Sequence, residues 1–526
     1  MLIALSSDKV SRRVWGNLNN WPGPLVLIIA AAATGLLFSL LPLNWTAAAL
    51  VVITVVTLAL IQPLFVLGLA LIAGPFGALE SVWFGGASFD SGQLLLLLAL
   101  AAWISRRLAA RQFNLPRIFL LLPLTLFIVV GLVSLLSAPD IVLGLVEVLK
   151  WIEITAVMVM VADLGRDLGR KKFIDRKQSL VVGIGWVLVM VMLAGVFQAF
   201  IGIWQFMLRG EGPEHFIVLG RFYRAFGTFE QPNPFGGYMN MTALLALGVL
   251  IGLLMAWISR MRSSTGRESG SRNRKLLQSI ILLLAVLSVT AVTSIALLFS
   301  WSRGAWMGFL AGITVMVFFW PKHLRYGLLL LFAALMGIFL LYQSNILPPT
   351  IVTRVSGFAE DLTFGDVRGV DINDDNYSVL ERLAHWQAAL DMAGERPWLG
   401  VGFGNYGTAY ADHALLNWPD ALGHAHNYYL NILAEVGVIG FSAYLLLWGA
   451  IFWQTLRVLR REDWPVRGVA LGLIGVWTAF TIHHSVDKLY VNNIYIHLGV
   501  LLGLLQLVDF HALQGIENID YLEENS

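Results

Sequence analysis

Long apolar runs separated by short polar segments occupy most of this 526-residue chain, and they constrain its fold more than any motif does. A helix that crosses a bilayer needs about 20 predominantly apolar residues. Because backbone polar groups inside the bilayer must be satisfied within the protein, such runs fold as helices. Only 13% of the residues are charged, whereas soluble domains are about a quarter charged. The chain is therefore predicted to be an all-α, polytopic integral membrane protein.

The apolar runs predict about 12–14 transmembrane helices. Candidate spans fall at residues 24–42, 45–61, 64–79, 92–105, 118–137, 141–161, 179–203, 236–258, 276–299, 305–320, 326–343, 428–452, 467–483 and 493–509. The first run lacks a small-residue cleavage site, so we expect it to be retained and not removed as a signal peptide.

This map predicts four parts of the chain. They are N-terminal spans at 1–203, central spans with external arginine motifs at 204–343, a large extracytoplasmic loop with short helices at 344–427, and C-terminal spans with a short cytoplasmic tail at 428–526. Most of the 35 basic residues fall in alternate polar segments, beginning with the N-terminal one. Since cytoplasmic loops carry an excess of Lys and Arg, both termini are expected in the cytoplasm.

Composition excludes several kinds of function. The net charge of +2 gives no indication of nucleic-acid binding. The chain has no cysteine, which excludes disulfides, thiolate metal sites and a cysteine nucleophile.

Arginines on the predicted outer side mark two motifs. Arg221 and Arg224 are three residues apart in a loop rich in proline and glycine, and they could face one anion or form an ordinary aromatic surface loop. Arg303 lies at the junction of two apolar runs, where it could extend to the lipid headgroups or bind a partner. Charge at a membrane edge is costly and is commonly retained for function.

The large loop ends in a histidine motif, Gly423-His-Ala-His-Asn-Tyr-Tyr-Leu430. His424 and His426 are two residues apart and do not share a helix face, so no zinc pair is predicted. A histidine beside Asn427 at a helix start suits proton transfer or a hydrogen bond to a hydroxyl; alternatively, it is an interfacial histidine with no such role. Earlier in the loop, residues 376–395 predict a surface helix from which Arg382 and His385 project.

Charged residues also fall inside or beside predicted spans. Glu147, Lys150 and Glu153 recur at every third position, which fits either a self-neutralised structural triad or a functional site. His483, His484, Asp487 and Lys488 end a later span on the outer side and could border the same cavity as these charges.

Four motifs resemble those of the O-antigen ligase and O-antigen polymerase family, which bacterial protein O-oligosaccharyltransferases share. His426-Asn427 is followed after nine residues by Gly437 and then by Gly440. The other three motifs are Ser302-Arg303-Gly304-Ala305, the segment Gly227 to Asn233 preceded by Arg224, and Arg382 with Pro397-Trp-Leu-Gly-Val-Gly402. All four lie on the same predicted face of the membrane.

The resemblance implies glycan transfer at the extracytoplasmic face of the bacterial inner membrane, without a metal or other cofactor. The donor would be a glycan on a polyprenyl pyrophosphate, usually undecaprenyl, and the acceptor a hydroxyl of a glycan, lipid A core or protein. His426, Arg303 and Asn427 would be the catalytic residues. Substrate-binding residues would be Arg224, Arg221, Arg382, His424 and Lys150.

Two other classes of function stay open from the residues. A secondary transporter fits the number of spans, although it would predict repeats and a site at the bilayer midplane. A non-catalytic export or scaffold component would leave the histidine and arginine motifs unexplained. Within the resembling family, ligase, polymerase and protein transferase differ in their acceptor, which the sequence does not identify.

Overall fold

The computed structural model describes residues 35, 42–83, 90–112, 114–168, 176–263, 269–344, 366–373 and 376–523. It divides into two units, Met1–Gln62 and Pro63–Ser526. In the first unit, α3 (Leu43–Ile61) corresponds to the predicted second span. The predicted span at 24–42 lies almost entirely outside the described residues.

The second unit is helical, apart from a two-stranded hairpin of β1 (Ile217–Val218) and β2 (Phe222–Tyr223) among the described residues. Its first helices are α4 (Pro63–Ala73), α5 (Gly77–Trp83), α6 (Ser91–Ala109), α7 (Leu121–Ser134), α8 (Ile141–Asp167), α9 (Arg176–Met207), α10 (Pro232–Ser263) and α11 (Ser269–Phe299). Those that follow are α12 (Arg303–Phe319), α13 (Leu324–Gln343), α15 (Tyr377–Glu395), α16 (Tyr406–His413), α17 (Tyr428–Arg461), α18 (Val466–His483) and α19 (Ile494–Glu523).

The all-α polytopic class is confirmed. Within the described residues, 10 helices are long and apolar enough to cross a membrane, and Leu121–Ser137 and Arg303–Phe319 are shorter apolar helices. The helix α8 has 27 residues but carries several charges. The helix α19 continues to Glu523, beyond residue 509, where the last predicted span ends.

Glycines bring α10, α12 and α18 into close contact. A Cβ atom at Gly248 in α10 would lie 2.3 Å from the backbone N of Gly472 in α18, and one at Gly308 in α12 would lie 2.7 Å from the carbonyl oxygen of Ala479. Small residues allow such backbone approach between membrane helices. This packing places the first residues of α12 beside the last residues of α18, where Gly304 faces Nε2 of His483.

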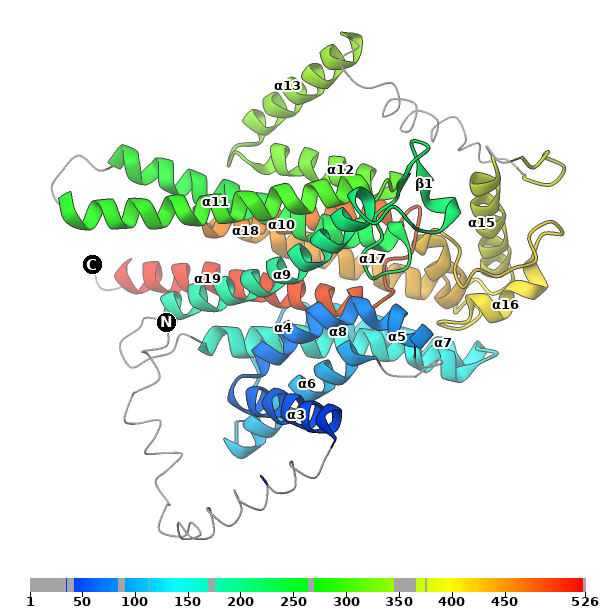
Figure 1. Ribbon diagram of the computed structural model, residues 1–526, viewed down its shortest axis with the longest axis horizontal. Helices are drawn as coiled ribbons and strands as arrows, with labels where there is room; N and C mark the ends of the chain where they lie inside the picture. Colours follow the sequence, from blue (N-terminus) through cyan, green and yellow to red (C-terminus); the bar gives the residue numbers. More distant parts are fainter. Residues whose placement is uncertain are drawn as a thin grey trace. The chain divides into compact units, whose positions relative to one another are not determined.

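The helices α15 and α16 lie at one end of the long helices of this unit, and α15 runs across them (Figure 1). The predicted helix at 376–395 is thus confirmed, but His385 does not project from it, since only 1% of its surface is exposed. The reason is α16, whose residue Tyr410 stacks on the His385 ring at a centroid distance of 4.6 Å.

A break in α17 joins this end of the protein to the bundle. Gly437 has φ 62° and ψ −169° inside the helix. There the chain at 397–402 pairs with α17, since Val401 N–H donates to Ala434 O (2.9 Å) and Val438 N–H donates to Pro397 O (2.8 Å). The glycine-containing segment 397–402 and the break at Gly437, which belong to two of the motifs, therefore pack against each other through their backbones.

We expect Gly437→Ala to destabilise the protein by at least about 1–3 kcal/mol, the cost of this glycine-only backbone conformation. A Cβ atom there would also lie 2.4 Å from the carbonyl carbon of Trp398. The matched control is Gly449→Ala in the same helix, where nothing lies within 4 Å of the added atom. Thermal unfolding in detergent measures both variants, and equal midpoints would contradict the assignment.

Candidate active site

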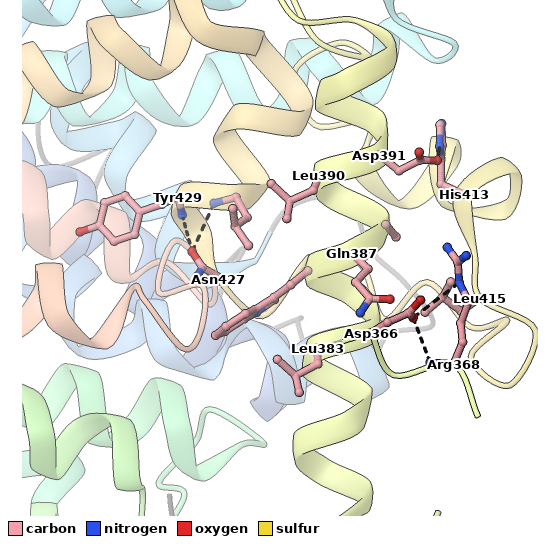
Figure 2. Close-up of a pocket in the computed structure, with 13 residues that line it drawn as sticks. Asp366, Arg368, Leu383, Gln387, Leu390, Asp391, His413, Leu415, Asn427 and Tyr429 are labelled. Carbon is pink, nitrogen blue, oxygen red and sulfur yellow. Dashed lines mark hydrogen bonds and ion pairs between the residues drawn. The ribbon is translucent and has the colours of Figure 1, made fainter. Parts of the chain in front are cut away.

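The histidine motif leads directly into the first turn of α17. The Asn427 side chain accepts hydrogen bonds from the backbone N–H groups of Tyr429 (3.0 Å) and Leu430 (3.2 Å), as Figure 2 shows. This N-cap satisfies amides that have no partner within the helix. His426 has φ 51°, in the left-handed region that non-glycine residues seldom adopt. Such conformations persist where the surrounding structure fixes them, and they cluster at functional sites.

Two backbone contacts fix the loop that holds His426. The N–H of Ala425 donates to Oδ1 of Asn431 (3.1 Å), one turn into α17. The N–H of Tyr428 donates to the carbonyl oxygen of His484 (2.8 Å), just after α18. The loop is therefore attached to both helices that border it.

The two imidazoles of the motif lie against each other. The backbone N–H of His426 donates to Nδ1 of His424 (3.0 Å), and the ring centroids are 4.4 Å apart. Among the residues that the structure describes, Nε2 of His426 is buried and has no hydrogen-bond partner. Burial, followed by the neighbouring His424, lowers the pKa of His426 to about 3. At pH 7 the ring is therefore neutral and able to accept a proton.

Asp487 completes a compact cluster with these histidines. The ligand atoms of His424, His426 and Asp487 lie within 4.8 Å of one another, a donor set that Zn²⁺ accepts. Burial, and then the positive charge of Lys488, lower the pKa of His424 to about 3. The spacing of the three groups therefore permits a metal.

Lys488 links this cluster to α8. Its Nζ lies 2.9 Å from Oε1 of Glu147, and Nζ of Lys150 lies 2.9 Å from the same oxygen. The Lys488 backbone N–H also donates to Oδ1 of Asp487 (2.8 Å). Lys150, expected among the substrate-binding residues, is therefore an ion-pair partner of Glu147, and Glu147 and Lys488 lie between it and the histidine cluster.

We expect Glu147→Gln to destabilise the protein by about 3–5 kcal/mol, because it leaves the buried Lys488 without its carboxylate. The matched control is Asp463→Asn, whose carboxylate also contacts a lysine, Lys322, at 2.6 Å but is 85% exposed. That exposed pair is worth at most about 1 kcal/mol. Denaturant unfolding in micelles compares the two, and a control that loses as much as Glu147→Gln would contradict the role of burial.

The two arginine motifs meet at the start of α12. Nε of Arg224 donates to the carbonyl oxygen of Ser300 (3.0 Å), and its Nη2 donates to Oδ1 of Asn233 (3.3 Å). The Ser302 hydroxyl, which caps α12, donates to the same Asn233 oxygen (2.8 Å). Arg303 is the first residue of α12. Arg224 therefore lies beside the positive end of the α12 dipole, where Arg303 begins the helix, and this end of a helix favours an anion.

The end of α18 joins the arginine group to the histidine loop. Gly304, next to Arg303, packs on the ring of His483. The following residue, His484, holds the Tyr428 backbone through its carbonyl oxygen. Residues at the end of α18 therefore contact both the arginine motif and the histidine motif.

The other two predicted arginines differ in position. Arg221 is exposed, and its guanidinium lies 4.3 Å from the ring centroid of Phe222. Arg382 donates to the Ser378 carbonyl oxygen of its own helix (3.0 Å), and its charge contributes to the lowered pKa of His426. Arg382 is thus close to the histidine cluster, whereas Arg221 lies on the hairpin loop before Arg224.

A buried polar group behind His426 was not foreseen from the sequence. The His385 ring is 5.6 Å from that of His426, and its Nδ1 is 2.9 Å from the Tyr406 hydroxyl. Burial lowers the pKa of His385 to about 4, so this ring is also neutral at pH 7. The Tyr406 backbone N–H donates to Oε1 of the buried Glu435 (3.2 Å). The spacing of these residues along the chain carries no signal that they meet.

A cavity of about 780 Å³ adjoins the start of α17. Figure 2 shows its side chains, which come from α15, the segment 366–368, the end of α16 and the first turn of α17. Asn427, the neighbour of His426, is part of its lining. The cavity therefore reaches the residue that follows His426 in the chain.

Comparison with known proteins confirms the resemblance. Residues 288–445 match the sequence model of the family described as O-antigen ligase. This region includes Arg303, Arg382, His424, His426 and Asn427, whereas Lys150, Arg221 and Arg224 precede it. The matched family favours a glycan-transferring ligase over the transporter alternative.

A curated relative agrees with this match. A general O-oligosaccharyltransferase of Acinetobacter baylyi (strain ATCC 33305 / BD413 / ADP1) is 26% identical over 293 residues, which are 54% of this chain and 44% of that protein. The similarity thus spans less than half the length of the relative. Residues 288–445 of this chain are therefore similar to the O-antigen ligase family.

Proposed function

We propose that this protein transfers a glycan from a polyprenyl-pyrophosphate carrier to an acceptor hydroxyl at the extracytoplasmic face of the inner membrane. One observation carries the proposal. A neutral histidine, His426, presents a buried Nε2 that has no hydrogen-bond partner among the described residues, and its loop is joined through the end of α18 to the arginines at the start of α12.

His426 would accept the proton of the acceptor hydroxyl as its oxygen bonds to the anomeric carbon of the glycan. The bond between this carbon and the pyrophosphate oxygen breaks at the same time, and the bonding electrons leave with the pyrophosphate. Asn427 would orient the loop through its cap. His424 fixes the His426 backbone through its hydrogen bond.

Arg303 and Arg224 would bind the pyrophosphate. Charge builds on its bridging oxygen as the bond breaks, and guanidinium groups stabilise such charge through paired hydrogen bonds. Arg382 would contact phosphate or glycan, and Lys150 would act through Glu147. Because two arginines would supply the compensating charge, the proposal needs no metal to neutralise the leaving group.

The experiment uses the purified protein in lipid with an undecaprenyl-pyrophosphate glycan and three acceptors offered separately: lipid A core, a second lipid-linked glycan and a serine-containing protein. EDTA is present throughout. We expect one acceptor to be glycosylated at the same rate with and without EDTA, and that acceptor identifies the reaction as ligation, polymerisation or protein glycosylation. Activity that EDTA abolishes and Zn²⁺ restores would contradict the metal-free proposal.

A further inference from the structure

We propose that the cavity between α15 and α17 binds neutral sugar residues of the glycan that is transferred or of the glycan that accepts it. The inference rests on the proposed function, since that function brings sugars to His426. The cavity volume of about 780 Å³ falls in the range of small-ligand sites, about 300–1,000 Å³.

The position of the cavity suits a substrate of the same reaction. It is lined on one side by Asn427 and Tyr429 at the start of α17, and on the other by residues of α15 (Figure 2). Neither Arg224 nor Arg303 is among its lining residues within the described chain. The pyrophosphate and the ligand of this cavity would therefore be bound by different residues near His426.

The charges that line the cavity disfavour a second phosphate site. Asp366 and Asp391 contribute two carboxylates. Nε of Arg368 lies 3.7 Å from Oδ1 of Asp366, so the cation is already close to an acid. Nδ1 of His413 lies 2.6 Å from Oδ2 of Asp391 in the same way. An anion would meet carboxylates here, whereas a neutral ligand would not be repelled.

The same groups suit hydroxyls. Carboxylates accept hydrogen bonds from O–H groups, and the amide of Gln387 both donates and accepts. Leu383, Leu390 and Leu415 add an apolar surface beside them. Sugars present hydroxyls at their edges and C–H groups on their faces, so a wall with both characters matches a carbohydrate better than a charged headgroup or an acyl chain.

Two variants test the cavity without altering the His426 loop. Gln387→Ala removes a polar group, and Leu390→Trp places a bulky ring where Leu390 is 52% exposed at the cavity wall. The matched control is Asp412→Asn, an exposed acid of α16 outside the lining. Thermal unfolding first establishes that each variant is folded.

Binding is measured by saturation-transfer NMR on the full chain in nanodiscs, with free glycans as probes. One probe is the glycan released by mild acid from the undecaprenyl-pyrophosphate donor, and the other is the released lipid A core oligosaccharide. We expect one probe to bind, and both cavity variants to weaken it about tenfold, as the loss of one or two hydrogen bonds would do. The Asp412→Asn protein should bind like the wild type.

The probe that binds distinguishes the donor glycan from the acceptor glycan. In the transfer assay, the cavity variants should raise the KM of that same substrate about tenfold and leave kcat unchanged, because they remove binding remote from the reacting atoms. If neither probe binds, or if the cavity variants bind as the wild type does, the cavity is not a sugar site. Binding without transfer by the wild type would instead overturn the proposed function and leave the sugar site in place.

Discussion

His426→Ala should reduce the rate of glycan transfer by about 10²–10⁴-fold, the usual contribution of a positioned general base. The variant should retain its KM for the lipid-linked donor, because the pyrophosphate is assigned to Arg303 and Arg224. His426→Gln can still accept a hydrogen bond but cannot take up a proton, so its rate should be nearly as low. Initial rates with the acceptor identified above measure both.

The pH dependence adds a second test of His426. Burial and the neighbouring His424 lower its pKa to about 3, so the ring stays in its proton-accepting form as the pH falls below 6.5. The rate should therefore not decline between pH 8 and pH 5 with the ordinary pKa of histidine. A decline centred near 6.5 that is absent from His426→Gln would contradict the buried environment described here.

Arg303→Ala should slow transfer by about 10²–10³-fold, which is the cost of removing one group that stabilises developing negative charge. Arg303→Lys should recover only part of this loss, because a single ammonium cannot form the paired hydrogen bonds of a guanidinium. The loss should fall on kcat, since charge on the pyrophosphate grows as the bond to the sugar breaks.

The matched control for Arg303 is Arg209→Ala. Arg209 is an exposed arginine of the same predicted external side, and its guanidinium lies over the ring of Trp204. We expect the control to retain nearly the wild-type rate. Equal losses in both variants would point to a general electrostatic effect of external arginines, and an unchanged rate in Arg303→Ala would remove it from the catalytic assignment.

The fold class followed from the sequence because about 20 consecutive apolar residues allow few other structures. The helix at 376–395 was also predictable from its apolar spacing. The burial of His385 could not be predicted, because its partner Tyr410 lies in a separate helix after a glycine-rich turn. Spacing along one helix indicates one buried face and carries no information about a second element that covers the opposite one.

The sequence proposed individual residues for the candidate site, without the polar group around His385, and it did not predict how these residues assemble. Ser302 and Asn233 are 69 positions apart, and only the packing of α10 on α12 brings their side chains within 2.8 Å. Similarly, Lys150 appeared as a lone lysine between two acids of one helix. Lys488 binds the same Glu147 carboxylate as Lys150. It is 341 residues from Glu147 and lies in a short turn between two later helices.

The most direct test of the proposed reaction is mass spectrometry of both products after a single incubation of donor, acceptor and purified protein. We expect one equivalent of undecaprenyl pyrophosphate for each glycosylated acceptor, because the bond between the anomeric carbon and the pyrophosphate oxygen is the one that breaks. Release of undecaprenyl monophosphate together with a phosphorylated glycan, or carrier release without a glycosylated acceptor, would contradict glycan transfer to a hydroxyl at this site.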